Sequence, residues 1–300
     1  MKSFQGKTAV ITGAGSGFGR EFARIGAGLG MKLVLADVEQ GALDAVADEL
    51  HAAGAEVLAL RTDVSNAESV DALAAATMQR FGAPGLVFNN AGVFHGGLLW
   101  EHSVRDWEWV LGVNLWGVVH GVRAFTPLML AAAKADPAYE GHIVNTASMA
   151  GLLTPPNMGL YNVSKHAVVA LTETLYQDLQ LVTDQLSCSV LCPYFVPTGI
   201  NSSQRNRPEA LAEEDAPTQS QLIAQAMSDK AVGSGRVSAA QVAQKVFDAV
   251  AAGGFYVYSH PHALGGVQAR MEAIMTHANP PDPFAERPEV GQTLRRQLRE

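Results

Sequence analysis

Residues 12–19 form a glycine-rich segment, Thr12-Gly13-Ala14-Gly15-Ser16-Gly17-Phe18-Gly19. It follows a short apolar run, residues 8–11, and precedes an amphipathic pattern over residues 18–28. This order predicts a buried strand, a tight turn and a helix whose N-terminus points at negative charge, as in dinucleotide-binding folds. The pattern is T-G-x-x-x-G-x-G, because Phe18 stands where G-x-G-x-x-G needs its last glycine, and Gly15 fills a position that the pattern leaves free. A glycine cluster also occurs in ordinary turns, so the context decides.

Short apolar runs alternate with longer amphipathic segments along most of the chain. The runs predicted as strands are 8–11, 32–36, 57–60, 86–88, 143–145 and 189–191, with 255–258 as a further one. The predicted helices are 18–28, 39–53, 66–81, 103–134, 160–183 and 238–252. Continuously apolar strands alternating with helices predict the α/β class, a doubly wound Rossmann-type parallel sheet with helices on both faces.

The chain of 300 residues contains no internal repeat and no linker that divides it into two cores. We expect one domain over residues 1–260 and a C-terminal helical extension and tail over 261–300. Residues 194–236 form a long polar connection with a weak helix near 219–228, which is typical of a substrate loop. The tail is expected to be broken by prolines, with Arg295, Arg296 and Arg299 solvated or paired with a neighbouring subunit.

The composition argues against several partners. With 21 Lys+Arg and 29 Asp+Glu the net charge is −8, which disfavours nucleic acid and anionic membranes as partners. No apolar run reaches the roughly 18–20 residues that span a bilayer, and the N-terminus lacks a signal-peptide pattern. Cys188 and Cys192 fall in one predicted strand and cannot pair there. We therefore expect a cytoplasmic protein with reduced thiols and no membrane association.

Asp37 ends the second predicted strand, about 20 residues beyond Gly17. A carboxylate at this place binds the adenosine-ribose hydroxyls and repels a 2′-phosphate, which favours NAD over NADP. The alternative is that Asp37 only caps the following helix. Asp63, after the third predicted strand, is open to the same two interpretations, a helix cap or an adenine contact.

Six residues follow the carboxyl ends of predicted strands: Gly13, Asp37, Asp63, Asn89, Ser148 and Pro193. The carboxyl ends of parallel strands meet at one edge of a sheet, which is where ligands bind in such folds. We expect these residues to share one crevice.

Tyr161 and Lys165 lie four positions apart at the start of a predicted helix, so both side chains face the same way. An ammonium group near a phenol favours the phenolate and moves the tyrosine pKa toward the working range of an acid/base group. A solvated surface pair is the alternative. Ser148 and the glycines at the strand ends favour the catalytic interpretation.

With Asn89-Asn90-Ala91-Gly92 after the fourth strand and Asn114 in the next helix, the ordered motifs over residues 8–198 resemble the short-chain dehydrogenase/reductase family. The resemblance implies that Tyr161 is the acid/base and that Lys165 lowers its pKa and holds the nicotinamide ribose. It implies that Ser148 binds the substrate oxygen and that Asn114 sustains a water relay. It also implies a homo-oligomer, dimer or tetramer, formed through helices 103–134 and 160–183.

The cofactor contacts expected on this basis are Gly13, Ser16, Gly17, Phe18, Gly19, Asp37, Val38, Asp63, Val64, Asn90, Ala91, Gly92, Tyr161, Lys165, Pro193, Val196 and Thr198. Thr198 matches the family residue that touches the nicotinamide carboxamide. The family pattern P-G-x-V-x-T is altered here, because Tyr194 replaces the glycine. We expect an apolar pocket for a fairly bulky secondary alcohol or ketone, lined by Phe94, His95, Met149, Leu152, Leu153 and Tyr194.

The sequence thus predicts an NAD-dependent oxidoreductase that interconverts a secondary alcohol and a ketone. A non-catalytic dinucleotide-binding sensor or scaffold is the alternative, and a methyltransferase that binds adenosylmethionine is a third. Neither the sensor or scaffold nor the methyltransferase needs a tyrosine with a shifted pKa. Trp100, Trp107, Trp109 and Trp116 favour core or subunit packing over substrate stacking. His260 and His262 lack a third ligand, so no metal site is predicted.

Overall fold

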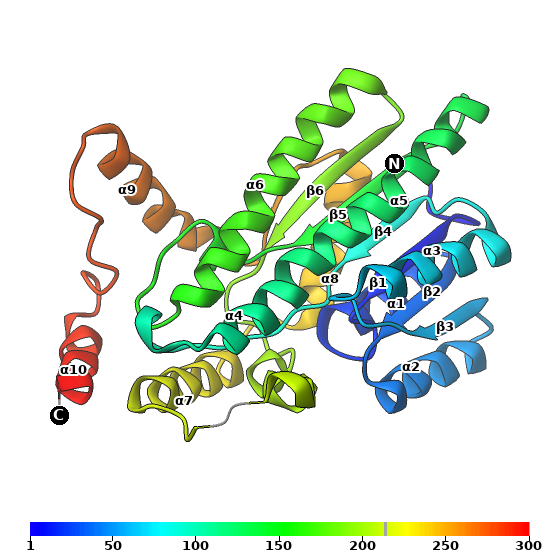
Figure 1. Cartoon of the computed structure of the whole chain (residues 1–300). Helices are drawn as coiled ribbons and strands as arrows, with labels where there is room; N and C mark the ends of the chain where they lie inside the picture. Colours follow the sequence, from blue (N-terminus) through cyan, green and yellow to red (C-terminus); the bar gives the residue numbers. More distant parts are fainter. Residues whose placement is uncertain (213–214, 300) are drawn as a thin grey trace.

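The sheet runs parallel throughout, with strand order β3-β2-β1-β4-β5-β6-β7 (Figure 1). The computed structural model describes residues 1–212 and 215–299. The strands are β1 Thr8–Thr12, β2 Lys32–Asp37, β3 Val57–Arg61, β4 Leu86–Asn89, β5 Gly141–Thr146, β6 Leu186–Cys192 and β7 Tyr256–Tyr258. The order reverses between β1 and β4, which is the switch point where ligands bind in this architecture. The predicted Rossmann-type α/β class is confirmed.

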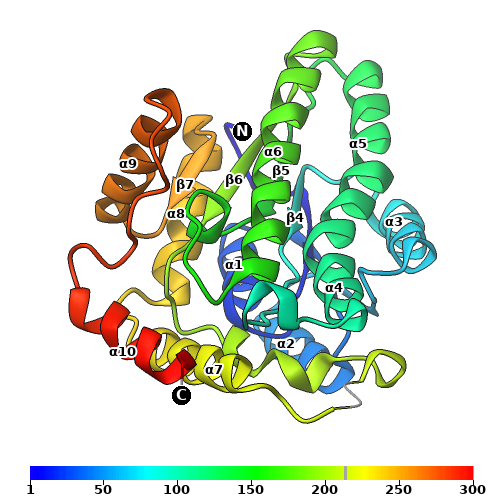
Figure 2. The same ribbon diagram turned by 60° about the vertical axis from the view of Figure 1, so that its left-hand side comes forward.

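Helices cover both faces of the sheet (Figure 2). On one face lie α1 Gly17–Gly28, α2 Gln40–Ala52 and α8 Ala239–Ala252; on the other lie α3 Ala67–Phe81, α5 Gly117–Ala135 and α6 Gly159–Val182. Alternate residues of β1 serve the two cores: Ala9 and Ile11 pack with α1 and α8, and Val10 packs with α3 and α5. Burial on both faces is why the central strands read as unbroken apolar runs.

The predicted helix over 103–134 is divided in the structure. It consists of α4 Val104–Leu111, a π-helical turn Gly112–Trp116, and α5. A π turn inserts an extra residue into a helix and often marks a functional site. Here it contains the buried Asn114. By length and composition alone, Val104–Ala135 is one helix that could cross a membrane, but a core helix passes the same test, and Phe125 and Met129 are buried against the sheet.

The described residues of the long connection 194–236 are more ordered than expected. They contain two short 3-10 segments, Ile200–Asn206 and Glu209–Leu211, and α7 Gln219–Gly233, which is longer than the predicted weak helix. Thr218 and Gln221 form a capping box at the start of α7. This box is the local signal that favours the helix.

The described part of the C-terminal extension, 261–299, contains two α-helices where one was expected. α9 Leu264–Met275 is followed by the proline-rich segment and then by α10 Pro288–Arg299. The expected break at the prolines 280–283 is present, but residues 288–299 form a helix, where Pro288 occupies a position that helices favour for proline. Arg295, Arg296 and Arg299 are exposed, as expected for a solvated end. In Figure 1, α9 and α10 lie to one side of the sheet, joined by an extended segment. α10 contacts α7, because Gln219 Nε2 donates to the Gln297 carbonyl at 2.7 Å.

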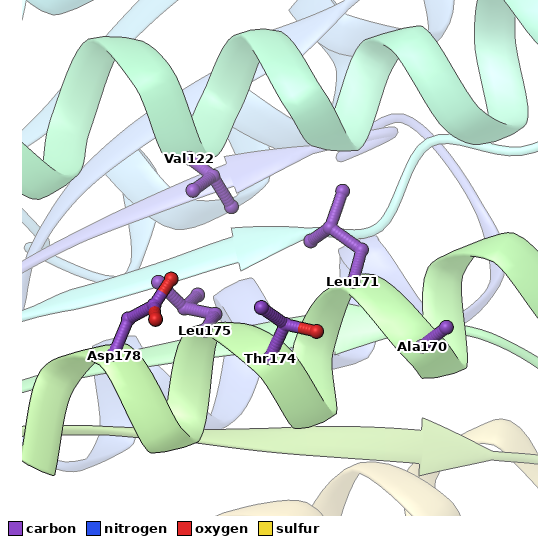
Figure 3. A pocket seen from close by; sticks show the side chains of 6 residues that line it. All are labelled: Val122, Ala170, Leu171, Thr174, Leu175 and Asp178. Atoms are coloured by element: carbon purple, nitrogen blue, oxygen red, sulfur yellow. The ribbon is translucent and has the colours of Figure 1, made fainter.

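The outer face of α5 and α6 carries a shallow groove (Figure 3). Its lining residues are Val122, Ala170, Leu171, Thr174, Leu175 and Asp178. Of the four tryptophans, Trp109 is buried in a core cluster, whereas Trp100 and Trp116 are exposed. Core packing is therefore confirmed for Trp109 and, in part, for Trp107, which packs against the same cluster. Subunit packing by Trp100 and Trp116 stays a prediction.

Candidate active site

The loops after β1 and β4 are joined by hydrogen bonds. Thr12 Oγ1 accepts from the backbone N–H groups of Asn90 at 2.9 Å and Ala91 at 3.1 Å. Asn90 Nδ2 donates to the Thr12 carbonyl at 2.9 Å, and Thr146 Oγ1 donates to Asn90 Oδ1 at 3.2 Å. Asn90 thus joins the ends of β1, β4 and β5. Thr12 was quoted in the glycine motif but not predicted as a site residue.

The glycine turn leaves no room for side chains. Gly13 and Gly17 have positive φ of 66° and 51°, which favours glycine. A Cβ on Gly19 would lie 2.0 Å from the Gly13 carbonyl oxygen. The first turn of α1 lies within the described residues. Its N-cap residue, Ser16, forms no side-chain hydrogen bond to the backbone of the turn, and the turn contains no acidic residue. The helix N-terminus is therefore free to bind a pyrophosphate, and these residues fit a dinucleotide.

Asp37 faces this turn. Its Oδ2 accepts from the Gly15 backbone N–H at 2.8 Å, and its Oδ1 accepts from the Glu39 N–H at 3.0 Å. The N-cap of α2 is Glu39, so Asp37 is not the cap that the alternative interpretation required. A Cβ on Gly15 would lie 3.0 Å from Asp37 Oδ2 and 2.9 Å from Ala42 Cβ. Gly15 is thus a further site residue that the pattern treated as free.

Asp63 organises the turn after β3. Its Oδ1 accepts from the backbone N–H of Ser65 at 2.9 Å and from the Ser65 hydroxyl at 2.7 Å. The cap interpretation is wrong, because the N-cap of α3 is Asn66, whose side chain accepts from Ser69 N–H. Val64 is buried against Gly117, where a Cβ would meet it at 2.8 Å. An adenine contact by Asp63 stays a prediction.

Ser148 and Tyr161 come together at the end of β5. The Ser148 hydroxyl accepts from Ala150 N–H at 3.1 Å and donates to the Pro193 carbonyl at 3.3 Å. Burial raises the pKa of Tyr161 to about 12, although a hydrogen bond with Ser148 lowers it. The Phe94 ring packs edge-on against Tyr161 with centroids 5.2 Å apart. The serine and the phenol are therefore adjacent in a dry environment.

Lys165 lies behind the tyrosine ring. Its Nζ is 5.7 Å from the Tyr161 centroid and donates to the Thr146 carbonyl at 2.9 Å. Burial lowers the pKa of Lys165 to about 8. The expected lowering of the Tyr161 pKa by this ammonium is wrong for this structure, because burial of the phenol dominates. A Cβ on Gly92 would lie 3.5 Å from Lys165 Nζ, so this glycine keeps space beside the ammonium.

Asn114 uses its amide to join three segments. Its Oδ1 accepts from Val93 N–H at 2.8 Å, and its Nδ2 donates to the Val93 carbonyl and to Ser164 Oγ, both at 3.0 Å. The π turn places this side chain at the start of α6, next to the motif of Tyr161 and Lys165. The structure thus shows a positioning role, and the water relay stays a prediction.

The loop after β6 brings Thr198, one of the predicted cofactor contacts, to the glycine turn. A Cβ on Gly17 would lie 2.9 Å from Thr198 Cβ, so Thr198 sits against the glycine turn. Val196 is buried in the core instead, and Phe18 is partly buried there. The Val38 carbonyl accepts from Arg61 Nε at 3.1 Å. Sequence reasoning missed this guanidinium beside the predicted ribose site.

The predicted pocket residues separate into two groups. Phe94 packs on Tyr161, and Tyr194 is 43% exposed with its ring near those of Phe195 and His260. Leu153 reaches α9, where it would contact a Cβ on Gly266 at 3.3 Å. Met149 and Leu152 are instead buried in a core cluster with Val168 and Val190.

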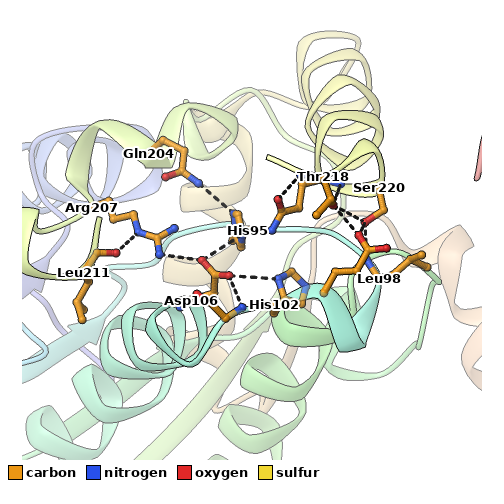
Figure 4. Close-up of polar contacts among 12 residues, drawn as sticks. His95, Leu98, His102, Asp106, Gln204, Arg207, Leu211, Thr218 and Ser220 are labelled. Carbon is orange, nitrogen blue, oxygen red and sulfur yellow. Dashed lines mark hydrogen bonds and ion pairs between the residues drawn. The ribbon is translucent and has the colours of Figure 1, made fainter. Parts of the chain in front are cut away.

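His95 lies in a buried polar network (Figure 4). Gln204 Nε2 donates to His95 Nδ1 at 3.0 Å, and His95 Nε2 is 3.4 Å from Asp106 Oδ1. His95, His102 and Asp106 also place three potential metal ligands within 4.8 Å of one another. Asp106 is already paired with a cation, however, because Arg207 is 2.8 Å away. The sequence offered no signal for this network beyond the capping box of Ser103 and Asp106.

Known proteins with this arrangement identify the family. The family model described as short chain dehydrogenase matches residues 7–209. The chain belongs to the short-chain dehydrogenase/reductase family. A member from Burkholderia phymatum, solved in complex with NAD, is 57% identical, covers 95% of this chain and 100% of its own, and superimposes with a TM-score of 0.92. The family is an oxidoreductase family, and the resemblance over residues 8–198 is confirmed.

Two further members show the range of the family. The 1-deoxy-11-beta-hydroxypentalenate dehydrogenase of Streptomyces arenae is 34% identical over 94% of this chain and 92% of its own. A metagenomic short-chain oxidoreductase in complex with NADP is 32% identical, covers 64% of this chain and 84% of its own, and has a TM-score of 0.59. Similar proteins have thus been solved with either dinucleotide bound.

Proposed function

We propose that this protein is an NAD-dependent oxidoreductase that interconverts a secondary alcohol and a ketone. The observation behind the proposal is the hydrogen-bonded pair of Ser148 and Tyr161, with Lys165 buried behind the ring. Ser148 follows the carboxyl end of β5, and Tyr161 and Lys165 lie in the first turns of α6, on the same edge of the sheet as the glycine turn. A sensor or scaffold would need the turn but not this pair.

Each residue has a separate task in the reaction. Ser148 Oγ donates a hydrogen bond to the substrate oxygen, and the Tyr161 hydroxyl exchanges a proton with that oxygen. Bound NAD supplies the hydride acceptor at the nicotinamide ring. Lys165 provides positive charge beside the phenol, and Asn114 holds the backbone of Val93 against α6. Apolar burial excludes water from the phenol.

The proposed substrate is fairly bulky and apolar or aromatic. Phe94 supplies an aromatic edge beside Tyr161, and Tyr194 supplies an exposed ring where other family members have glycine. Leu153 and α9 lie close together near the end of the same crevice. A small charged hydroxy acid would leave these apolar groups unused.

NAD is proposed as the preferred cofactor. The Asp37 carboxylate lies against the glycine turn, where it can accept from both ribose hydroxyls and repel a 2′-phosphate. The NAD complex of the Burkholderia phymatum protein supports this choice, whereas the NADP complex shows that the fold alone does not decide it.

A panel of secondary alcohols, followed by absorbance of the reduced cofactor, tests the activity. We expect 1-phenylethanol to be oxidised with NAD faster than 2-butanol or lactate. Tyr161→Phe should reduce kcat by about 10²- to 10⁴-fold while the NADH dissociation constant stays within about twofold. Full activity in Tyr161→Phe would rule out this mechanism. Binding of adenosylmethionine with no NADH binding would favour a methyltransferase.

A homo-oligomer and a cytoplasmic location complete the proposal. The groove of α5 and α6 places Leu171 and Leu175 on an outer face suited to a second copy of the chain (Figure 3). Light scattering of wild type and Leu171→Asp tests this: a dimer or tetramer should become a smaller species. Cys188 and Cys192 are free and buried, which is compatible with a reducing compartment.

A further inference from the structure

Residues 200–207 lie directly over the segment that packs on the catalytic tyrosine. Ser203 Oγ accepts from the backbone N–H of Phe94 at 2.9 Å. Gln204 Nε2 donates to His95 Nδ1 at 3.0 Å. The 3-10 segment Ile200–Asn206 thus reaches two consecutive residues of the loop after β4, and the first of these packs its ring on Tyr161.

Arg207 ends this segment and is the buried cation of the network in Figure 4. Its side chain is 5% exposed, and its Nη2 lies 2.8 Å from Asp106 Oδ1. Its Nε donates to the Leu211 carbonyl at 2.6 Å, and its Cζ lies 5.1 Å from the centroid of the Trp109 ring. The guanidinium therefore contacts α4 at Asp106 and Trp109, and it contacts the short segment Glu209–Leu211 through the Leu211 carbonyl.

Asp106 is a buried carboxylate whose surroundings favour its charged form. Its side chain is 2% exposed, and its Oδ2 accepts from the Ser103 backbone N–H at 2.7 Å. Burial opposes ionisation of Asp106, but His95, the Ser103 N–H and Arg207 together hold its pKa below the ordinary value. Burial also lowers the pKa of His95 and His102. Arg207 is the nearer basic group to Asp106 Oδ1, at 2.8 Å against 3.4 Å for His95 Nε2.

A bound metal is the competing explanation for the three ligands His95, His102 and Asp106. A divalent cation there would bind the same carboxylate as Arg207, whose Nη2 lies 2.8 Å from Asp106 Oδ1. Two cations held by one buried carboxylate repel each other strongly. The ion pair is therefore the better explanation of the network.

We propose that Arg207 is the positioning residue for the substrate side of the site: paired with Asp106, it holds residues 200–207 against Phe94 and His95 and so fixes the ring that packs on Tyr161. This rests on the proposed function, because it takes Tyr161 as the acid/base. Breaking a buried pair by removing one partner leaves an uncompensated charge, so the effect should be large.

The central variant is Arg207→Met, which keeps an unbranched apolar stem and removes the guanidinium and its charge. We expect the KM for 1-phenylethanol to rise about 10- to 100-fold, with kcat within about threefold and the NADH dissociation constant within about twofold. Amide hydrogen exchange over residues 200–211 should accelerate at least about tenfold, while β5 and α6 stay unchanged.

Arg24→Met is the matched control. Arg24 makes a two-pronged pair with Glu49, at 2.6 and 2.8 Å, but both side chains are about 40% exposed, and they join α1 to α2 away from the substrate loop. Exposed pairs contribute little, so this variant should keep wild-type KM and exchange. Arg207→Lys should restore part of the substrate affinity, because it returns the charge without the planar fork.

The double variant Asp106→Asn/Arg207→Met separates positioning from folding. The amide oxygen introduced by Asp106→Asn would still accept from the Ser103 N–H, so the thermal midpoint should recover relative to Arg207→Met while the raised KM persists.

Wild-type KM and exchange in Arg207→Met, or in the double variant if the single one does not fold, would overturn the proposal. A parallel change of KM, kcat and NADH affinity, or one stoichiometric zinc in the purified protein, would also overturn it. If 1-phenylethanol is not oxidised by the wild type, the substrate assignment fails, and the exchange measurement still decides the role of Arg207.

Discussion

The cofactor side and the substrate side of this site are held together in different ways. On the cofactor side, short loops after β1 and β4 are joined through backbone groups and two side chains, Thr12 and Asn90. On the substrate side, the described residues of the long connection 194–236 contact the rest of the chain through side chains such as those of Ser203, Gln204 and Arg207. Arg207 pairs with Asp106, and Ser220 Oγ accepts from the Leu98 N–H at 2.8 Å.

This difference follows from the length of each loop. The position of a loop of a few residues is fixed by the two buried elements that it joins, so only the turn geometry must be right. A long connection loses much more conformational freedom and needs specific contacts along its length. The cofactor side should therefore respond to changes of backbone space, and the substrate side to loss of single polar groups.

The largest effect is expected in the glycine turn. In Gly19→Ala the new methyl group would meet the Gly13 carbonyl at 2.0 Å, so the turn must open. We expect the free energy of unfolding to fall by about 3 kcal/mol and NADH affinity to fall about 100-fold. Denaturant titration measures the free energy of unfolding, and NADH fluorescence measures the NADH affinity.

Gly28→Ala is its control on the same helix. A Cβ on Gly28 meets nothing within 4 Å, so this variant should be stabilised by about 0.5–1 kcal/mol. Equal free energies of unfolding and equal NADH affinities in Gly19→Ala and Gly28→Ala would contradict the close packing of the turn.

Lys165 should make the stability of the protein depend on pH. Its pKa falls from the ordinary value of 10.5 to about 8, so between these values the unfolded chain keeps a proton that the folded protein has lost. Stability therefore rises with pH across this window, by roughly 2–3 kcal/mol relative to Lys165→Met. Urea titrations of both proteins at pH 7.5 and 10 test this. Parallel changes in the two proteins would show that Lys165 is not the group responsible.

A smaller effect is expected at the ribose end. Asp37→Ser removes the repulsion of a 2′-phosphate, while Arg61 lies beside Val38 and Arg205 pairs with Glu39 at 2.7 Å. The ratio of kcat/KM for NADP over NAD should rise about 10- to 100-fold. Asp44→Ser, in an exposed pair with Gln40 on α2, should leave the ratio unchanged. An unchanged ratio in Asp37→Ser would remove Asp37 from cofactor selection.

The smallest effect is expected from removing residues 288–300. Only Gly291 and Leu294 of α10 are buried among its described residues, so the thermal midpoint should fall by less than about 2 °C. Differential scanning fluorimetry measures it. A fall of more than about 5 °C would show that α10 belongs to the same cooperative unit as the sheet.

The sequence by itself determined the parallel sheet, the glycine turn, and the grouping of Ser148, Tyr161 and Lys165. These features depend on short-range patterns: apolar runs, glycine spacing and a four-residue helical repeat, each placed at a strand end by the topology. α10 was missed although Val290, Leu294 and Leu298 recur at helical spacing, because the prolines before it suggested a broken tail.

Only the tertiary structure decided the raised pKa of Tyr161, the place of Gly15 against Asp37, and the pairing of Asp106 with Arg207. The physical reason is the same in each case. Burial and charge pairing depend on which distant segments pack together, and residues 106 and 207 carry no local pattern that relates one to the other. The substrate side of the site is therefore a property of the folded chain, whereas the cofactor side can already be read in residues 12–19.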